Sequence, residues 1–223
     1  MSIEKGIAEI DTEQEIAAII QKLNRLPDQI AAPNILKDAI NDTTRQIRRS
    51  LNKYAKKRYA ISDASVLTQK SKGATWVDRA TQSNQTATIL STGPMLDLMS
   101  FLTNPGSGTA AAAAKVINEN SQKSLEMNGL KAFVTTFASG HTAIVQRHPP
   151  DKYTRGEAKR LSAHAAKGRL WTPDMTKIKK LLGPAVPHMM GIVFSNNQVE
   201  IDRMVYDMLQ THIQRRIDEA MAK

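Results

Sequence analysis

The chain has 223 residues, which allows one domain with extensions or two small domains and is long enough to bury a core. Its formal net charge of +10 predicts attraction to a polyanion: nucleic acid, an anionic membrane or an acidic protein surface. The absence of cysteine excludes disulfides, thiolate metal sites and cysteine nucleophiles. Hydrophobic residues make up 41% of the chain and aromatic residues only 4%, so we expect a core of aliphatic side chains and methionine.

The first residues are acidic rather than basic and apolar, so no secretory signal is expected. Nowhere do about 18 apolar residues follow one another, the length that a membrane-spanning helix requires. We therefore expect a soluble protein that is made in the cytoplasm and has no membrane partner.

Two amphipathic helices are predicted near the N-terminus. The first lies in a helical extension over residues 1–32 and begins at the capping-box spacing of Thr12 and Glu15. The second begins at Pro33 and carries apolar residues three and four apart as far as Tyr54. We expect the first helix to dock either on the core of its own chain or on a neighbouring subunit.

Between this helix pair and the middle of the chain the helical periodicity fades. Residues 59–61 and 86–90 are predicted as short strands. The apolar cluster at residues 95–102 is expected in the core rather than in a ligand pocket. The alanine-rich inserted segment 104–128 has high helix propensity but a weak apolar face, so it is interpreted as an exposed helix or a mobile arm.

The central stretch, residues 129–147, predicts a β-hairpin. Two runs rich in Val, Ile, Thr and Phe flank the segment from Ala138 to His141, and a glycine in so short a loop favours a hairpin. An isolated hairpin is only marginally stable, so we expect it at the centre of a sheet. Helices can cover that sheet, because a broad apolar stripe also runs from Ile201 to Ile217.

These elements predict an α+β fold: a small antiparallel sheet built around a central β-hairpin, packed by N-terminal and C-terminal amphipathic helices, with extended arms or loops.

Two stretches concentrate positive charge. On the second predicted helix, Lys and Arg lie opposite the apolar stripe, and residues 152–180 carry nine basic residues against two acidic ones. The latter predicts a basic excursion loop over residues 148–177. Each stretch is interpreted either as a solvated surface or as a contact for a polyanion, such as DNA phosphates, or for an acidic partner. On the helix face no aromatic residues are interleaved, so base stacking is not expected there. The candidate contacts are Arg45, Arg48, Arg49, Lys53, Lys56, Lys152, Arg155, Lys159, Arg160, Lys167 and Arg169.

The sequence contains no catalytic constellation. No two of the five histidines stand four residues apart on a predicted helix, so a zinc site is not expected. Ser139 and His141 lack the Gly-x-Ser-x-Gly elbow, and the glycines around Ser107 lack the Gly-Lys-Ser/Thr ending of a Walker motif. The acidic N-terminal residues are interpreted as solvated charges at a helix start. We expect no enzyme activity, no metal and no cofactor.

Three parts of the chain together resemble the prophage minor tail protein Z family of long-tailed bacteriophages. They are the amphipathic segments 16–26 and 35–54, the hairpin segment 129–147 ending in Val-Gln-Arg, and Ile-Lys-Lys-Leu-Leu-Gly-Pro-Ala-Val-Pro-His-Met at 178–189 with the helix after it. The alanine-rich segment replaces a shorter stretch of the family.

The resemblance implies a structural virion protein that acts in tail completion at the neck and is made in the host cytoplasm. Its partners would be other copies of itself in a ring, the tail tube terminator and the head–tail connector proteins. It implies a single α+β tail-completion domain over residues 1–223, and the family has no catalytic residue to carry over.

A second hypothesis comes from the basic residues alone: a double-stranded DNA-binding protein that uses the basic helix face and the basic loop without base readout. The two hypotheses are compatible, because DNA traverses the neck lumen and a basic face could line it. A third hypothesis, a hydrolase, has no motif in its favour.

Overall fold

The computed structural model describes residues 4–8, 32–68, 74–106, 110–127, 130–147 and 178–221. They form an α+β fold with helices and several small antiparallel sheets, which confirms the predicted class. The chain divides into two compact units, each assembled from segments far apart in sequence. The first draws on Met1–Lys57, Ser65–Pro94 and Pro184–Lys223, and the second on Arg58–Ala64 and Met95–Gly183. The predicted helix at residues 12–26 and the basic loop 148–177 lie outside the described residues.

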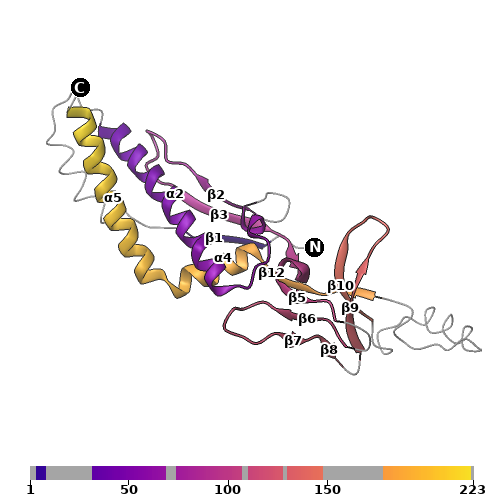
Figure 1. The fold of residues 1–223 in the computed structure, drawn as a ribbon. Coiled ribbons are helices and arrows are strands. Elements are labelled where there is room, and N and C mark those ends of the chain that lie inside the picture. Colours follow the sequence, from indigo (N-terminus) through magenta and orange to yellow (C-terminus); the bar gives the residue numbers. More distant parts are fainter. Residues whose placement is uncertain are drawn as a thin grey trace, which may run out of the picture. The chain divides into compact units, whose positions relative to one another are not determined.

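The sheet of the first unit has the strand order β1–β3–β2 (Figure 1). Its strands are β1 (Glu4–Ala8), β3 (Thr88–Gly93) and β2 (Ala74–Asp78), and both outer strands pair antiparallel with β3. Side chains along β3 alternate between half-buried and buried, as expected for a strand with one covered face. The strand predicted at 86–90 is therefore confirmed with shifted bounds. Glu4 is one of the acidic N-terminal residues interpreted as charges at a helix start; it begins a strand, so that interpretation is wrong for Glu4.

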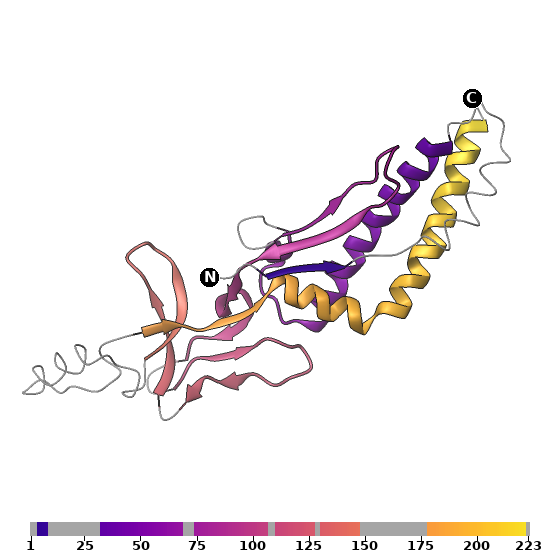
Figure 2. The ribbon, with the colours of Figure 1, turned by 180° about the vertical axis from the view of Figure 1, so that it is seen from behind.

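The described α-helices all belong to the first unit (Figure 2). They are α2 (Ala32–Arg58), α4 (Val186–Asn196) and α5 (Gln198–Met221). The second predicted helix is confirmed as α2, with Pro33 in the first turn, where its missing N–H is not needed. α4 packs on the sheet through β1 and β3. A short 3-10 helix, η1 (Ala64–Leu67), precedes β2.

The core of the first unit lies between α2, α5 and the segment that joins β2 to β3. It consists of Ile35, Leu36, Ala39 and Ile40 of α2, Leu209 and Ile213 of α5, and Ala80 and Ala87. The apolar stripe predicted on the last helix is confirmed, because Ile201 and Val205 are also buried. Each such side chain contributes about 1.5–3 kcal/mol by leaving water, so this stripe is what holds the two long helices together.

The predicted hairpin is confirmed in the second unit. β9 (Leu130–Thr136) and β10 (Thr142–Arg147) pair antiparallel, with Thr136 opposite Thr142. They occupy the centre of a four-stranded sheet whose order is β11–β10–β9–β8, with β11 at Ile178–Lys180 and β8 at Glu126–Met127. The sequence predicted helices packed against this sheet. The core contacts described for those helices are instead with other elements of the first unit.

The prediction that the alanine-rich segment is an exposed helix or a mobile arm is wrong for its described residues. Residues 110–127 form no helix; they contain β6 (Ala113–Lys115), β7 (Lys123–Ser124) and β8. β6 lies between β5 (Leu102–Asn104) and β7 in a three-stranded sheet. Ala112 and Ala114 are buried, so packing of small side chains overrides their helix propensity.

The apolar cluster at residues 95–102 forms β4 (Met95–Asp97), the 3-10 helix η2 (Leu98–Ser100) and the start of β5. β4 lies beside β12 (Leu182–Ala185) in a two-stranded sheet. The core prediction is confirmed for Leu96, Leu98 and Phe101, which are buried, whereas Met95 and Leu102 are exposed. The strand predicted at 59–61 amounts to two isolated bridges, Tyr59 to Ile117 and Ile61 to Phe101.

Candidate interaction surface

The basic side of α2 separates into an exposed part and an inward part. Arg45, Arg49, Lys53 and Lys56 are exposed and recur four, four and three residues apart, a spacing that places them on one side of the helix. We call these four residues the basic strip. Arg48 does not belong to it: the side chain is half-buried, and Nη1 donates to the carbonyl of Thr75 in β2 over 3.3 Å. Arg48 as a polyanion contact therefore stays a prediction, and its Nη1 is engaged within the fold.

The charge around the basic strip is of one sign. Residues 43–58 contain seven Lys or Arg and no Asp or Glu. Successive members of the strip four residues apart are separated by about 6 Å along the helix axis. Such a row of cations attracts phosphates or carboxylates without reading their sequence.

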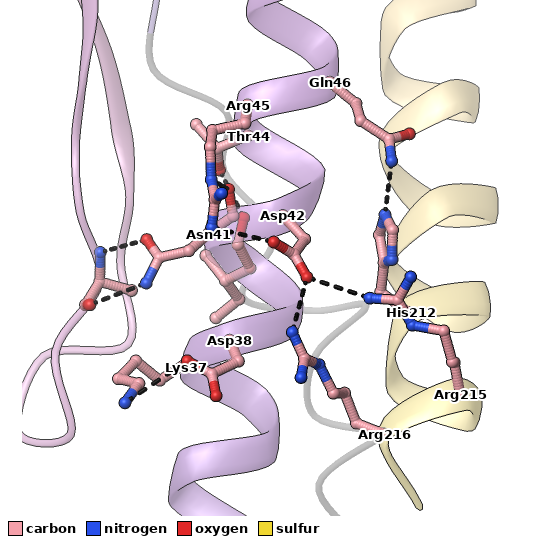
Figure 3. A network of polar contacts seen from close by, with 12 residues as sticks. Lys37, Asp38, Asn41, Asp42, Thr44, Arg45, Gln46, His212, Arg215 and Arg216 are labelled. Carbon is pink, nitrogen blue, oxygen red and sulfur yellow. Dashed lines mark hydrogen bonds and ion pairs between the residues drawn. The ribbon is translucent and has the colours of Figure 1, made fainter. Parts of the chain in front are cut away.

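Asp42 limits one end of the strip by binding three guanidinium groups (Figure 3). Its Oδ1 lies 2.9 Å from Nη2 of Arg45, and its Oδ2 accepts hydrogen bonds from Arg215 at 3.1 Å and Arg216 at 3.0 Å. The hydrogen bond with Asp42 raises the pKa of Arg216. The network joins α2 to α5 and leaves Arg49 and Lys53 as the strip residues with no ion pair among the described residues.

His212 lies in the same helix contact. It is buried, and its Nε2 lies 3.1 Å from the side-chain nitrogen of Gln46 (Figure 3). Its Nδ1 is also buried, and no described residue forms a hydrogen bond with it. Burial lowers the pKa of His212, and the positive charge of Arg215 lowers it further. A neutral imidazole of this kind is part of the packing between the helices.

Asn41 connects α2 to the segment that joins β2 to β3 through two hydrogen bonds. Its Nδ2 donates to the carbonyl of Ala80 over 3.1 Å, and its Oδ1 accepts the Ala80 amide over 2.9 Å. Two residues further along α2, the buried Oγ1 of Thr43 has no hydrogen-bond partner among the described residues and lies beside a small, mostly apolar cavity. The residues that line this cavity are Ile40, Thr43, Thr44, Thr86, Ala87, Val205 and Leu209, none of which is charged.

The second unit contains an Asp–His–Lys cluster at the hairpin turn. Nε2 of His141 lies 2.8 Å from Oδ2 of Asp97 in β4, and Nζ of Lys180 lies 4.0 Å from the same oxygen. The ring of His141 also stacks on Phe137, with 6.3 Å between centroids, and the Lys180 ammonium lies 5.3 Å from the Phe137 centroid. The contact between His141 and Asp97 holds the hairpin turn against β4.

A His–Asp pair can serve a nucleophile, but this one has none in contact. Among the described residues, no hydroxyl hydrogen-bonds to the His141 ring; the nearby hydroxyls of Thr136 and Thr142 bond to each other over 2.9 Å. The described ranges also contain no group of three or more acidic or histidine side chains that could hold a metal ion. None of the helices in those ranges is both long and apolar enough to cross a membrane.

Four sequence candidates, Arg45, Arg49, Lys53 and Lys56, are exposed on one side of α2, whereas the contacts that hold α2 and the hairpin turn in place were not predicted. The candidates Lys152, Arg155, Lys159, Arg160, Lys167 and Arg169 lie outside the described residues. The ion pairs of Asp42 join residues 173 and 174 positions apart, and Asp97 is 44 positions from His141, so no local pattern indicates them. No protein-family model, curated protein or solved structure matches the chain.

Proposed function

We propose that the chain is a structural virion protein of a long-tailed bacteriophage, acting in tail completion at the neck as a ring of copies. In this role it lies between the tail tube terminator and the head–tail connector. The proposal rests on the family resemblance of the helix pair, the hairpin segment and residues 178–189.

The direction of the polar contacts supports a structural role. Asp42, Asn41, Arg48 and Asp97 each join one element to another within a unit, through the contacts given above. An enzyme site would instead direct such groups into a common cavity, where substrate could reach them. Polar side chains that hold elements of the fold together are expected in a structural subunit, which binds its neighbours through its surfaces.

The experiment is a mass and shape measurement on the purified chain. Light scattering and electron microscopy should find closed rings whose mass is a multiple of 24.6 kDa and exceeds that of two copies. The measurement is made on the chain alone and again after neighbouring tail proteins are added. A chain that forms no ring, alone or with a tail tube terminator and a connector, would contradict the proposal.

The basic strip favours a second candidate function, binding of double-stranded DNA through phosphates. Each phosphate contact releases counterions, so affinity should fall steeply with salt. Such contacts carry no base readout, in keeping with the lack of aromatic side chains along the strip. A DNA-lined neck would use the same surface, so this function can accompany the first.

Charge reversal separates the two functions. The variant Arg49→Glu with Lys53→Glu should weaken DNA binding and flatten the logarithmic salt slope by about two, one for each lost contact. Arg79→Glu with Lys123→Glu is a matched control, because both side chains are exposed and lie outside α2. If the α2 variant instead blocks ring formation while the control does not, the strip is a protein interface.

A further inference from the structure

The outer face of α5 carries apolar side chains in water. Val199 is 86% exposed and Tyr206 is 38% exposed. They lie seven residues apart, two helical turns, and so on the same side of the helix. The core stripe, which contains Ile201 and Val205, occupies another side. α5 therefore has a second, uncovered stripe near its N-terminal end.

Two opposite charges lie between these apolar residues. Asp202 and Arg203 are exposed, and the Arg203 side chain is 85% exposed. Within the described residues, the ion pair of Arg203 is a long one, 3.9 Å to Asp207 one turn further along. An exposed pair of this kind contributes little to stability, so Arg203 can exchange this partner for another.

The stripe Val199, Asp202, Arg203, Tyr206 is self-complementary: read in the opposite direction, it places an apolar residue opposite each apolar residue and a charge opposite each charge of the other sign. When two copies of α5 lie antiparallel around a two-fold axis between positions 202 and 203, each Val199 faces the Tyr206 of the other copy. Each Asp202 then faces the other copy's Arg203. A parallel pair would oppose Asp202 to Asp202 and Arg203 to Arg203, which like-charge repulsion disfavours.

We propose that this stripe is an isologous docking surface for a second copy of the chain, with α5 antiparallel to α5. Two apolar contacts lie at the ends and two ion pairs in the middle. The arrangement pairs both charges of each copy and removes the Val199 side chain from water, which favours association. A two-fold contact uses the same patch twice, and that patch must be self-complementary, as this one is.

This inference stands apart from the proposed function. An isologous contact closes at two copies and cannot build a ring. It doubles whatever species the chain otherwise forms: a free chain becomes a dimer, and a ring becomes a pair of rings. A contact limited to two helical turns buries little area, so the association depends on protein concentration in the way of weak interfaces.

Charge swapping tests the ion pairs. Arg203→Asp places two acids on the stripe and Asp202→Arg places two bases there, so each variant should have about half the wild-type mass by light scattering. The double variant Asp202→Arg with Arg203→Asp should regain the full mass. An equimolar mixture of the two single variants should also regain it, because acidic and basic stripes pair. A helical circular dichroism spectrum equal to that of the wild type shows that each variant is folded.

Cysteine pairing tests the register, since the chain has no cysteine of its own. Val199→Cys and Tyr206→Cys should form a disulfide dimer only when the two variants are mixed and oxidised. Two copies of Val199→Cys place their sulfurs about 10 Å apart along the axis, too far for a disulfide. Val199→Cys mixed with Gln214→Cys is a control at an exposed position out of register.

The expected result is loss of mass in both single charge variants, its recovery in the double variant and the mixture, and covalent dimer in one cysteine mixture alone. A wild-type chain whose mass does not exceed that of Arg203→Asp at any concentration overturns the proposal. So does equal cross-linking in the Gln214→Cys control. A ring that persists in Arg203→Asp at half the mass would leave the proposed function intact.

Discussion

The side-chain nitrogen of Gln46 on α2 lies 3.1 Å from Nε2 of His212 on α5. An amide nitrogen only donates, so Nε2 must accept, and the single ring proton is on Nδ1. That N–H is buried and has no acceptor in the part of the chain that the structure describes. The contact between the long helices therefore contains a neutral histidine. A second proton, on Nε2, would face the amide nitrogen of Gln46, which cannot accept a hydrogen bond.

The first prediction concerns acid stability. The pKa of His212 lies below its ordinary 6.5, chiefly because of burial and then because of Arg215, with Arg216 acting in the same direction and Asp42 against it. The unfolded chain therefore binds the proton more readily than the folded one. The stabilisation is complete above the unfolded pKa and is lost as pH falls toward the folded pKa.

Urea unfolding followed by helical circular dichroism measures this effect. Between about pH 8 and about pH 5, the free energy of unfolding should fall further in the wild type than in His212→Gln, which cannot titrate. His188→Gln, at an exposed position of α4, should behave as the wild type. Equal pH dependence in wild type and His212→Gln would show that His212 is not the titrating group.

The second prediction concerns the centre of the network. Asp42→Asn removes the charge that holds Arg45, Arg215 and Arg216, while the Asp42 side chain itself is only 16% exposed. The amide keeps one accepting oxygen but turns an NH2 donor toward the remaining guanidinium groups, which should lower the free energy of unfolding by about 1–3 kcal/mol. Asp218→Asn is the control, because Asp218 is exposed and hydrogen-bonds Gln214 within its own helix. A loss as small as that of the control would mean that water replaces the carboxylate.

A third prediction compares two buried polar side chains on α2. Asn41→Ala leaves the N–H and the C=O of Ala80 without partners, at about 1–3 kcal/mol for each orphaned group. Thr43→Val removes a hydroxyl that has no partner and keeps the side-chain shape, so the free energy of unfolding should stay equal or rise. Unfolding in urea checks both. A large loss in Thr43→Val would reveal a bound water at that hydroxyl.

Sequence reasoning succeeded where a short stretch decides its own structure. The period of apolar residues on α2 and α5 and the glycine turn of the hairpin are local signals, and the confirmed elements follow from them. Gly140 in that turn has a φ of 79°, a left-handed value that few other residues adopt. These local signals specify elements, but they do not specify which sheet a helix covers.

The failures share a physical cause, which is that the deciding partner is distant in sequence. The alanines of β6 are in a strand because β5 and β7 pair on either side, although alanine alone favours a helix. Arg48 turns inward because the carbonyl of Thr75 lies within its reach, and helical periodicity carries no information about that carbonyl. The basic strip was recognised as a charged face, but its members could not be separated from Arg48 without the sheet.

The last prediction contrasts two glycines of the second unit. A Cβ at Gly183 would lie 2.5 Å from Cε2 of Phe101, and Phe101 is 1% exposed. Because the ring is enclosed, Gly183→Ala must displace core side chains, which typically costs about 1–3 kcal/mol. A Cβ at Gly140 meets nothing within 4 Å, so Gly140→Ala should cost only the left-handed backbone strain, about 1 kcal/mol. Amide hydrogen exchange in β10 measures both, because this strand is central to its sheet. Exchange should be faster in Gly183→Ala than in Gly140→Ala. The reverse order would mean that Phe101 has room to move and that the hairpin turn limits the stability of the sheet.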